Sequence, residues 1–301
     1  MKFTGERYLS NVSNFAISFE HWHRYLFASE FATNKKIFDI ACGSGFGSML
    51  LSKKATSVLA VDRDSEAISY ASKKYSNHNL KFIQESISSF KTHKGQFDLV
   101  VSFETIEHIP CREQGQMIEK IALSLDYNGI FISSTPDTDV YKDNNEFHLC
   151  ELNKKEYLGK LHKSFKYNVF LGQNIYVNSY IGNHQNGGKL TEYRLSLDGN
   201  LEYTPKNYYP NDTFMVALSS NYPLEFNGVN ILYDPSNLMT KLSDDRLEFY
   251  KNSIEAYKFK LSKRASLHEA YANEKRNNYV DSKNNEDIRR IAQLKRLISC
   301  I

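Results

Sequence analysis

Short apolar runs alternate with segments of helical length through the first half of the chain, and this order limits what the chain can fold into. The runs cover residues 36–41, 57–61, 80–83, 97–103 and 129–134. Residues 65–75 and 114–125 are examples of the helical segments between them. Strands joined by helical crossovers lie parallel in one sheet, with right-handed connections. The alternation therefore predicts an α/β fold with a mostly parallel sheet.

Two more apolar runs, residues 168–177 and 213–219, predict later strands on either side of a polar insert. Within the insert, apolar side chains alternate before and after an Asp198-Gly199 turn, namely Tyr193, Leu195, Leu197, Leu201 and Tyr203. This pattern predicts a β-hairpin. The insert is either a surface loop without a role or a lid over the substrate.

From residue 242 onward the apolar spacing is helical, and residues 241–301 carry a net charge of +5, which leaves −2 for the rest of the chain. The apolar stripes predict either helices packed on the body or a coiled coil that joins copies into a homo-oligomer. The basic cluster at residues 258–264 is either a solvated helix face or a contact with anionic lipid or a lipid-linked glycan. An apolar stripe at the end of the chain also suits a fragment of something longer.

Composition excludes several classes of protein. A hydrophobic content of 41% excludes wholesale disorder, and a net charge of +3 is too small to indicate nucleic acid. The four cysteines are widely spaced and lack a CxxC pair, which excludes a disulfide scaffold and a Cys-rich zinc site and suits a reducing cytosol. The sequence has no apolar leader and no run of about 18 apolar residues. We therefore expect a cytoplasmic protein.

A glycine-rich bend follows the first predicted strand and opens a helix. Asp39 precedes the bend, Gly43 and Gly45 form it, and Asp62 ends the second predicted strand. Glycines let the backbone turn sharply and approach a ligand, and an acid at the end of the second strand can accept hydrogen bonds from both ribose hydroxyls. A carboxylate at Asp39 would repel a pyrophosphate but attract an ammonium group. The bend therefore favours S-adenosylmethionine over NAD.

These motifs resemble the class I S-adenosylmethionine-dependent methyltransferases, and the resemblance extends over about residues 36–135. It implies a Rossmann-like, seven-stranded, mostly parallel sheet. It also implies which residues bind the cofactor. Asp39, Gly43 and Gly45 belong to the family's first motif, and Asp62, with its neighbour Arg63, is the ribose-binding acid. Ser86 and Ile87 lie at the adenine contact, and Phe103 flanks the cofactor. Many members have Asp where this chain has Ser86, so the adenine contact departs from the family's pattern.

The N-terminal segment resembles the lead-in of a bacterial subgroup linked to surface-polysaccharide biosynthesis (O-antigen and capsule). The residues that carry this resemblance are 5–8 (GERY) and 20–25 (EHWHRY). It implies an N-terminal helix over the cofactor and a basic residue, here Arg24, that faces the methionine carboxylate. A guanidinium pairs bidentately with a carboxylate. The alternative is an ordinary amphipathic helix with Arg24 in solvent.

The fourth predicted strand runs into an ExxEH motif formed by Glu104, Glu107 and His108. In an open α/β sheet the ligand crevice lies beyond the carboxyl ends of the strands. Helical spacing would place these three side chains on one face, where two carboxylates and an imidazole need a cation or a proton between them. With His148, just after the fifth strand, they predict a divalent-metal site for Mg²⁺, Mn²⁺, Fe²⁺ or Zn²⁺.

This arrangement is similar to that of the ubiquinone-pathway O-methyltransferases and the small-RNA 3′-terminal methyltransferases, which bind a metal at ExxEH plus a later His. The resemblance implies that the metal holds acceptor hydroxyls beside the methyl donor. An EH pair after the fourth strand also occurs in methyltransferases without a metal, where the His can act as a general base. We therefore treat Glu107 and His108 as catalytic candidates, with a structural role as the third alternative.

Together these patterns predict an N-terminal helical cap (1–35), a methyltransferase domain (36–223, insert about 178–212) and a helical C-terminal extension (224–301). The expected activity is transfer of a methyl group to a sugar hydroxyl in surface-glycan biosynthesis. Alternatives are a small-molecule or natural-product methyltransferase, an RNA 3′-end methyltransferase and a scaffold that has lost catalysis. The acidic body and the lack of a basic stripe on the catalytic half argue against nucleic acid.

Overall fold

The computed structural model describes residues 15–87, 90, 94–141, 145, 147–175, 193–195, 201–203, 212–226 and 232, with the backbone alone given for 15–18, 193–195 and 201–203. The chain divides into two compact units, Met1–Leu232 and Tyr233–Ile301. The second unit, with the predicted C-terminal helices and the basic cluster 258–264, lies outside the described residues. So do residues 5–8.

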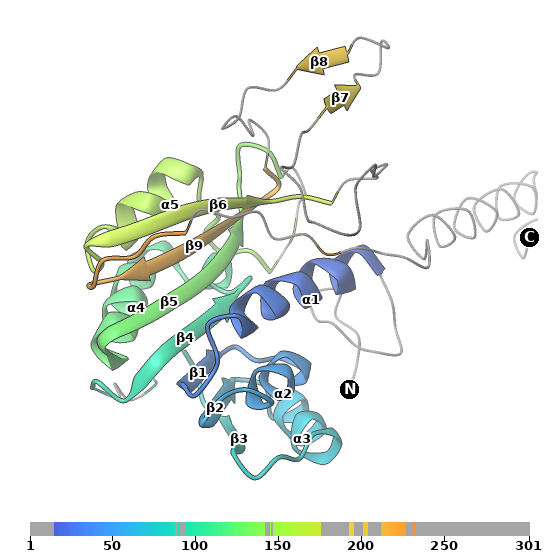
Figure 1. Cartoon of the computed structure of the whole chain (residues 1–301), viewed down its shortest axis with the longest axis vertical. Helices are drawn as coiled ribbons and strands as arrows, with labels where there is room; N and C mark the ends of the chain where they lie inside the picture. Colours follow the sequence, from blue (N-terminus) through green and yellow to red (C-terminus); the bar gives the residue numbers. More distant parts are fainter. Residues whose placement is uncertain are drawn as a thin grey trace, which may run out of the picture. The chain divides into compact units, whose positions relative to one another are not determined.

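A seven-stranded sheet forms the centre of the first unit, with strand order β3-β2-β1-β4-β5-β9-β6 (Figure 1). The strands are β1 (Lys36–Ile40), β2 (Ser57–Asp62), β3 (Leu80–Gln84), β4 (Phe97–Phe103), β5 (Leu125–Pro136), β6 (Tyr167–Gln173) and β9 (Phe214–Ser220). The first five pair in parallel, and β9 is antiparallel to both β5 and β6. The mostly parallel α/β sheet is thus confirmed. Two further strands, β7 (Tyr193–Leu195) and β8 (Leu201–Tyr203), form the predicted antiparallel hairpin.

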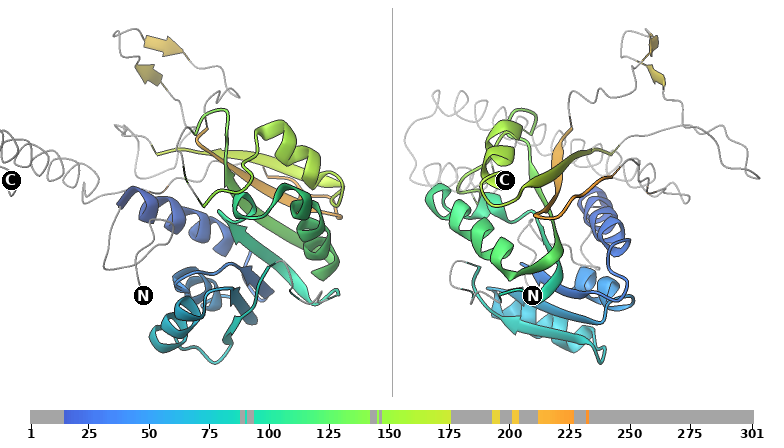
Figure 2. Two further views of the ribbon diagram at one scale, coloured as in Figure 1. Left: turned by 180° about the vertical axis from the view of Figure 1, so that it is seen from behind. Right: turned by 60° about the vertical axis from the view of Figure 1, so that its left-hand side comes forward.

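Helices cover both faces of the sheet (Figure 2). They are α1 (Phe15–Ser29), α2 (Phe46–Ser52), α3 (Ser65–Lys74), α4 (Cys111–Ser124) and α5 (Lys154–Leu161), with a short 3₁₀ helix, η1 (Ile106–His108), after β4. Local sequence starts two of them. The Asp64 side chain accepts hydrogen bonds from the first backbone N–H groups of α3, and Asn153 with Glu156 forms a capping box at α5. No described helix has the length and apolar character needed to cross a membrane.

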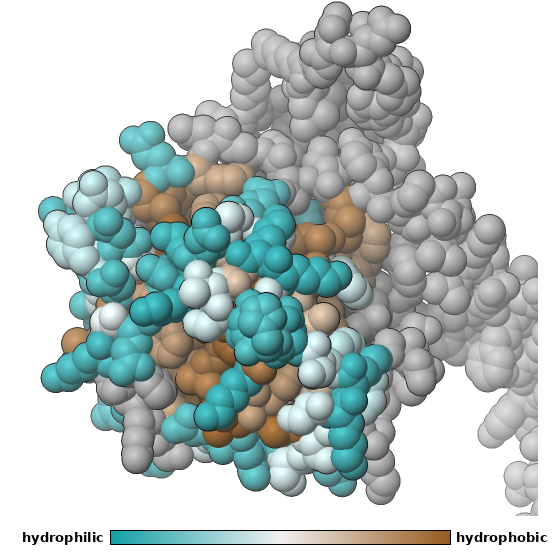
Figure 3. Space-filling view, turned by 60° about the horizontal axis from the view of Figure 1, so that its bottom comes forward, coloured by the Kyte–Doolittle hydropathy of each residue, from teal (hydrophilic) through white to brown (hydrophobic). Residues whose placement is uncertain are grey.

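Successive residues of the central strands feed two hydrophobic clusters, one on each face of the sheet. Ile37 and Leu99 pack with α1 and α2, whereas Phe38 and Val100 pack with α4 and α5. Because both faces are covered, apolar residues on these strands point to both sides of the sheet and do not alternate with polar ones. On the face shown in Figure 3, hydrophilic side chains predominate among the coloured residues and hydrophobic ones show between them. The sheet is therefore a rigid base, and the carboxyl ends of β1, β2 and β4 are held close together.

Gly45 shows how closely the bend after β1 is packed. Its φ is +79°, and a Cβ there would lie 2.6 Å from Ala71 Cβ and 2.8 Å from the Phe82 ring. Gly45→Ala is therefore expected to lower the free energy of unfolding by about 2–4 kcal/mol, measured by urea denaturation. Gly115→Ala is the matched control, because Gly115 lies in α4 with open space around it, and it should stabilise by about 0.5–1 kcal/mol. Equal effects of the two changes would contradict this account of the bend.

Candidate active site

A cavity of about 580 Å³ opens at the carboxyl ends of β1, β2 and β4. The chain is strained there. Ala41, just after β1, has φ +59°, and Glu104, just after β4, has φ +48°. Left-handed backbone at residues other than glycine is costly and concentrates at functional sites. Both residues line the cavity, so the strained backbone lies at the point where β1 and β4 end beside it.

Asp62 and Gly43 face this cavity together, as the sequence predicted. The Gly43 N–H donates to Asp62 Oδ2 at 2.9 Å, and the Asp64 N–H donates to Asp62 Oδ1 at 2.9 Å. Each carboxylate oxygen can accept more than one hydrogen bond, so Asp62 can also accept from hydroxyl groups of a ligand. The bend and the acid that follows β2 thus form one preorganised acceptor of hydroxyl hydrogens.

Asp39 is hydrogen-bonded to side chains of α1 and α2. It is fully buried and is not among the residues that line the cavity. Its carboxylate accepts hydrogen bonds from the Tyr25 hydroxyl at 3.0 and 3.3 Å and from Ser48 Oγ at 2.6 Å. Asp39 therefore ties α1 and α2 to the end of β1. A direct contact between Asp39 and a cofactor ammonium group stays a prediction.

Burial raises the pKa of Asp39 from 3.8 to about 7, although hydrogen bonds from Ser48 and Tyr25 oppose the rise. The folded protein then keeps a proton that the unfolded chain loses near pH 4. The stabilising contribution of this proton is present at low pH and is lost as pH rises through about 7. We expect the free energy of unfolding of wild type to fall relative to that of Asp39→Asn between about pH 4 and 7, and to level off above that range. Urea titrations at several pH values check this, and parallel curves would contradict it.

The other predicted cofactor residues divide into two groups. Arg63, Ile87 and Phe103 line the cavity. Gly45 and Ser86 are not among the lining residues, and Gly45 instead packs against α3 and β3. The adenine contact at Ser86 therefore stays a prediction, with Ile87 as the neighbour that does reach the cavity.

Arg24 lies behind the cavity wall and holds Glu104. Its side chain is 2% exposed; Nη1 lies 3.4 Å from Glu104 Oε1, and Nε donates to Gln173 Oε1 at 2.6 Å. The guanidinium also stacks over the Phe214 ring at 4.4 Å. Nη2 is buried and has no hydrogen-bond partner among the described residues. The alternative with Arg24 in solvent is therefore wrong, and its contact with a methionine carboxylate stays a prediction.

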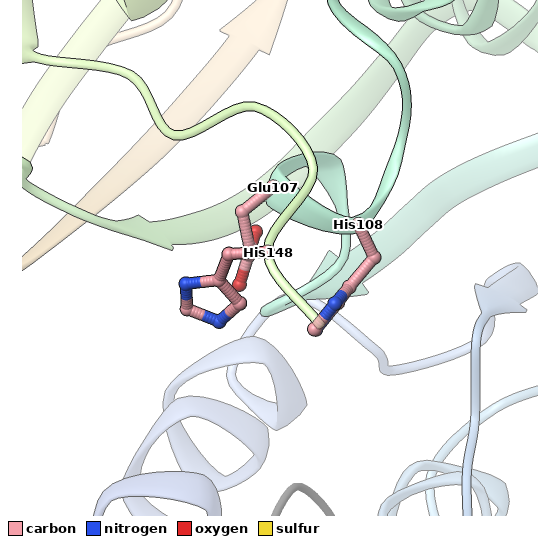
Figure 4. Close-up of side chains that lie close together, drawn as sticks. All are labelled: Glu107, His108 and His148. Atoms are coloured by element: carbon pink, nitrogen blue, oxygen red, sulfur yellow. The ribbon is translucent and has the colours of Figure 1, made fainter. Parts of the chain in front are cut away.

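Three of the four predicted metal ligands come together. The ligating atoms of Glu107, His108 and His148 all lie within 4.8 Å of one another. Figure 4 shows Glu107 and His108 extending from η1 and His148 approaching from a separate loop. Glu104 is not one of these three residues; its left-handed backbone precedes η1, and its carboxylate accepts from Ser134 Oγ at 2.6 Å. Its role as a ligand stays a prediction.

The hydrogen bonds of the two histidines define their basic nitrogens. A carbonyl oxygen can only accept, so His108 Nδ1, 2.9 Å from the Phe147 carbonyl, carries the hydrogen and leaves the lone pair of the neutral ring on Nε2. His148 Nδ1 lies 2.6 Å from Glu151 Oε1, and the Asn145 amide N–H donates to His148 Nε2 at 3.0 Å, so a cation bound at this Nε2 would have to displace the amide. A histidine oriented by a carboxylate is the usual arrangement around a metal-ligating imidazole.

Glu107 gives the test of whether these residues fit a cation. It is fully buried, Thr135 Oγ1 donates to its Oε2 at 2.9 Å, and Oε1 has no hydrogen-bond partner in the described part of the chain. Burial, and then the charge of Glu104, raise the pKa of Glu107 well above its usual range. A buried carboxylate oxygen without a partner beside two imidazoles fits a bound divalent cation.

Several residues of the site were not predicted from sequence. His21 and Tyr25 reach the cavity from α1, Glu85 from the end of β3, and Phe147 from the loop before His148. Burial, and then the charge of Arg24, lower the pKa of His21 to about 3, so its ring is neutral. The aromatic and histidine content of α1 was a usable signal for the first two. Nothing local to Glu85 or Phe147 marked them.

The cysteines also differ from expectation. Cys111 and Cys150 form a disulfide with a Cα–Cα distance of 5.4 Å, whereas Cys42 is free and buried. One disulfide is not a scaffold, so that exclusion is unaffected. The interpretation that the cysteines suit a reducing cytosol does not fit this pair. Spacing alone could not reveal it, because 39 residues separate the two cysteines and tertiary structure brings them together.

Sequence relatives match part of the chain. A family model described as a methyltransferase domain matches residues 37–129. A Mycobacterium tuberculosis relative, named probable S-adenosylmethionine-dependent methyltransferase, is 28% identical over 129 residues, 41% of this chain and 46% of the relative. A ubiquinone biosynthesis O-methyltransferase of Psychrobacter arcticus is 31% identical over 83 residues, 25% of this chain and 32% of the relative. The match with the mycobacterial relative thus spans about half of that protein's length.

Solved structures with a similar fold include a TehB-like S-adenosylmethionine-dependent methyltransferase from Corynebacterium glutamicum, with a TM-score of 0.43 and 17% identity over 66% of this chain and 86% of that one. The YcgJ protein of Bacillus subtilis gives a TM-score of 0.44 and 16% identity over 51% of this chain and 71% of that one. Residues 37–129 thus match a methyltransferase domain, and the matched region supplies the ends of β1, β2 and β4 at which the cavity opens.

Proposed function

We propose that this chain is an S-adenosylmethionine-dependent O-methyltransferase that methylates a sugar hydroxyl in surface-glycan biosynthesis with the help of a divalent metal. One observation carries the methyl-transfer part. The hydroxyl-accepting Asp62 and the imidazole of His108 line the same cavity of about 580 Å³. A donor with a ribose and an acceptor with a hydroxyl group can therefore meet there.

The residues of the cavity have separate tasks in this reaction. Asp62 holds the ribose, Phe103 and Ile87 enclose the apolar part of the donor, and His108 receives the acceptor proton at Nε2 or orients the acceptor through a cation. S-adenosylmethionine supplies a methyl group on a sulfonium, and displacement at that carbon needs the acceptor oxygen in line with the carbon–sulfur bond. The sulfonium loses its charge in the step, so alignment matters more than an anion-stabilising pocket.

The metal part of the proposal rests on the cluster of Glu107, His108 and His148. A divalent cation there would lower the pKa of an acceptor hydroxyl and orient it. Neighbouring hydroxyl oxygens of a sugar suit such a cation, and the N-terminal motifs resemble those of polysaccharide-linked methyltransferases. These two arguments favour a sugar acceptor.

A small-molecule acceptor is the second candidate, favoured by an apolar rim beside the cluster. Phe147 lines the cavity and is 45% exposed, and Leu149 is 60% exposed. Phe147 directly precedes His148, so an acceptor with an apolar group beside its hydroxyl would cover the Phe147 ring. The Psychrobacter relative is named for ubiquinone biosynthesis, which is consistent with this candidate.

The deciding experiment measures formation of S-adenosylhomocysteine by the full chain with a panel of nucleotide sugars, short glycans, catechols and short RNA. Turnover with sugars supports the proposal, turnover confined to catechols supports the second candidate, and turnover confined to RNA contradicts both. A chain that fails to bind S-adenosylhomocysteine in calorimetry would contradict methyl transfer altogether. Cytoplasmic location, contact with anionic lipid and homo-oligomerisation remain proposals that concern the whole protein.

A further inference from the structure

Two separate segments supply the cluster of Glu107, His108 and His148. The first two residues belong to η1, and His148 belongs to the loop between β5 and α5. Among the described residues of 137–153, namely 137–141, 145 and 147–153, the structure has no helix and no strand beyond an isolated bridge that joins Asp137 to Leu152. The position of His148 beside η1 therefore depends on specific cross-links between the loop and η1.

Non-covalent cross-links converge on the backbone of η1. The Leu149 and Cys150 N–H groups donate to the Glu107 carbonyl at 2.8 and 3.0 Å. Gln114, fully buried in α4, donates through Nε2 to the carbonyls of Ile106, Ile109 and Cys150 at 2.9, 3.2 and 2.8 Å. These bonds set the orientation of the loop, although each is individually weak in net terms.

The disulfide is the one covalent link between the segments among the described residues. Cys111 is three residues after His108, and Cys150 is two residues after His148. The bond joins two residues that are 39 positions apart in the sequence. It therefore excludes many conformations in which His148 would lie far from η1. Cys111 is exposed at the start of α4, so a thiol in solution can reach it.

We propose that the Cys111–Cys150 disulfide is a positioning clamp that holds His148 against Glu107 and His108, so that its reduction weakens metal binding. This inference rests on the proposed metal site. In reduction, a thiolate of a dithiol attacks one sulfur, the protein disulfide gains two electrons and two protons to become two thiols, and the dithiol becomes a disulfide. His148 then keeps only its non-covalent contacts, and the ligand set is no longer preorganised.

The test compares Mn²⁺ binding to the full chain in the oxidised form, after reduction by a dithiol that is then removed, and in the Cys150→Ser variant. Mn²⁺ is suitable because it prefers carboxylate and imidazole ligands to thiolates, so the new thiols will not bind it tightly. Electron paramagnetic resonance reports free Mn²⁺, and calorimetry with S-adenosylhomocysteine reports the donor cavity. Cys300→Ser is the matched control, because it removes a cysteine that is not part of the disulfide.

Reduction and Cys150→Ser are each expected to raise the Mn²⁺ dissociation constant about 10- to 100-fold, as loss of a positioning contact around a metal does. Affinity for S-adenosylhomocysteine should change less than about twofold, and reoxidation should restore Mn²⁺ affinity. Equal Mn²⁺ affinity of the oxidised and reduced forms would overturn the clamp while leaving the metal site intact. A matching loss of S-adenosylhomocysteine affinity would show general loosening and would also overturn it. If no form binds Mn²⁺, the metal site and the clamp fail together, whereas methyl transfer is judged separately by S-adenosylhomocysteine binding.

Discussion

Asp62→Ala is expected to weaken binding of S-adenosylhomocysteine by about 100-fold or more, because it removes two charged hydrogen bonds to the ribose. Asp62 lines the cavity, and both of its oxygens are held by the backbone N–H groups of Gly43 and Asp64. The carboxylate is therefore fixed before the ligand arrives, and little ordering opposes binding. Isothermal titration calorimetry measures the effect.

Asp98→Ala is the matched control for this change. The Asp98 carboxylate also accepts a backbone N–H, from Lys36 at 2.7 Å, but Asp98 is not among the cavity residues. It should leave the affinity for S-adenosylhomocysteine unchanged while removing a comparable structural bond. Wild-type affinity in Asp62→Ala would show that the ribose assignment is wrong. An equal loss in both variants would trace the effect to folding.

His108→Ala should reduce turnover at least about 100-fold, because both chemical roles open to His108 concern the acceptor oxygen. As a general base it removes the proton through Nε2, and as a metal ligand it completes the cluster with Glu107 and His148. The cluster geometry favours the ligand role, so we expect EDTA to stop turnover and Mn²⁺ to restore it. Steady-state rates with the acceptor identified in the panel measure both effects.

His162→Ala is the histidine control, since His162 ends α5, contacts Asn168 and does not line the cavity. Its turnover should equal that of wild type. Activity that EDTA leaves unchanged would assign His108 as the base and remove the metal from the proposed function. Full activity of His108→Ala would leave it with a structural role only.

The local patterns of the sequence were sufficient to predict the sheet and the positions of Gly43 and Asp62 at the donor side of the cavity. Alternating apolar runs and helical segments predicted the five parallel strands. The fifth, β5 (Leu125–Pro136), is longer than the apolar run at 129–134 from which it was predicted. The positions of Gly43 and Asp62 followed because parallel strands bring their carboxyl ends to one edge. The predicted helical tail lies outside the described residues and stays a prediction.

The rest of the site depends on side-chain contacts of Glu104 and Asp39 that sequence spacing could not predict. Helical spacing put Glu104 beside Glu107, but η1 begins only at Ile106, and Arg24 from α1 pairs with the Glu104 carboxylate. Asp39 was expected to contact the cofactor, which stays a prediction, and its hydrogen bonds to Tyr25 and Ser48 could not be read from its motif. In each case a partner distant in sequence determined the outcome, and a local motif contains no information about such partners.

By itself, then, the sequence determined the parallel sheet, the glycine bend and the acid after β2, because hydrophobic period and glycine conformations act over a few neighbouring residues. Only the tertiary structure decided that Tyr25 hydrogen-bonds to Asp39, that Arg24 pairs with Glu104 and that Glu107, His108 and His148 lie together near the Cys111–Cys150 disulfide. The physical reason is that these contacts close loops of many residues, and their geometry depends on how whole helices and loops pack on the sheet.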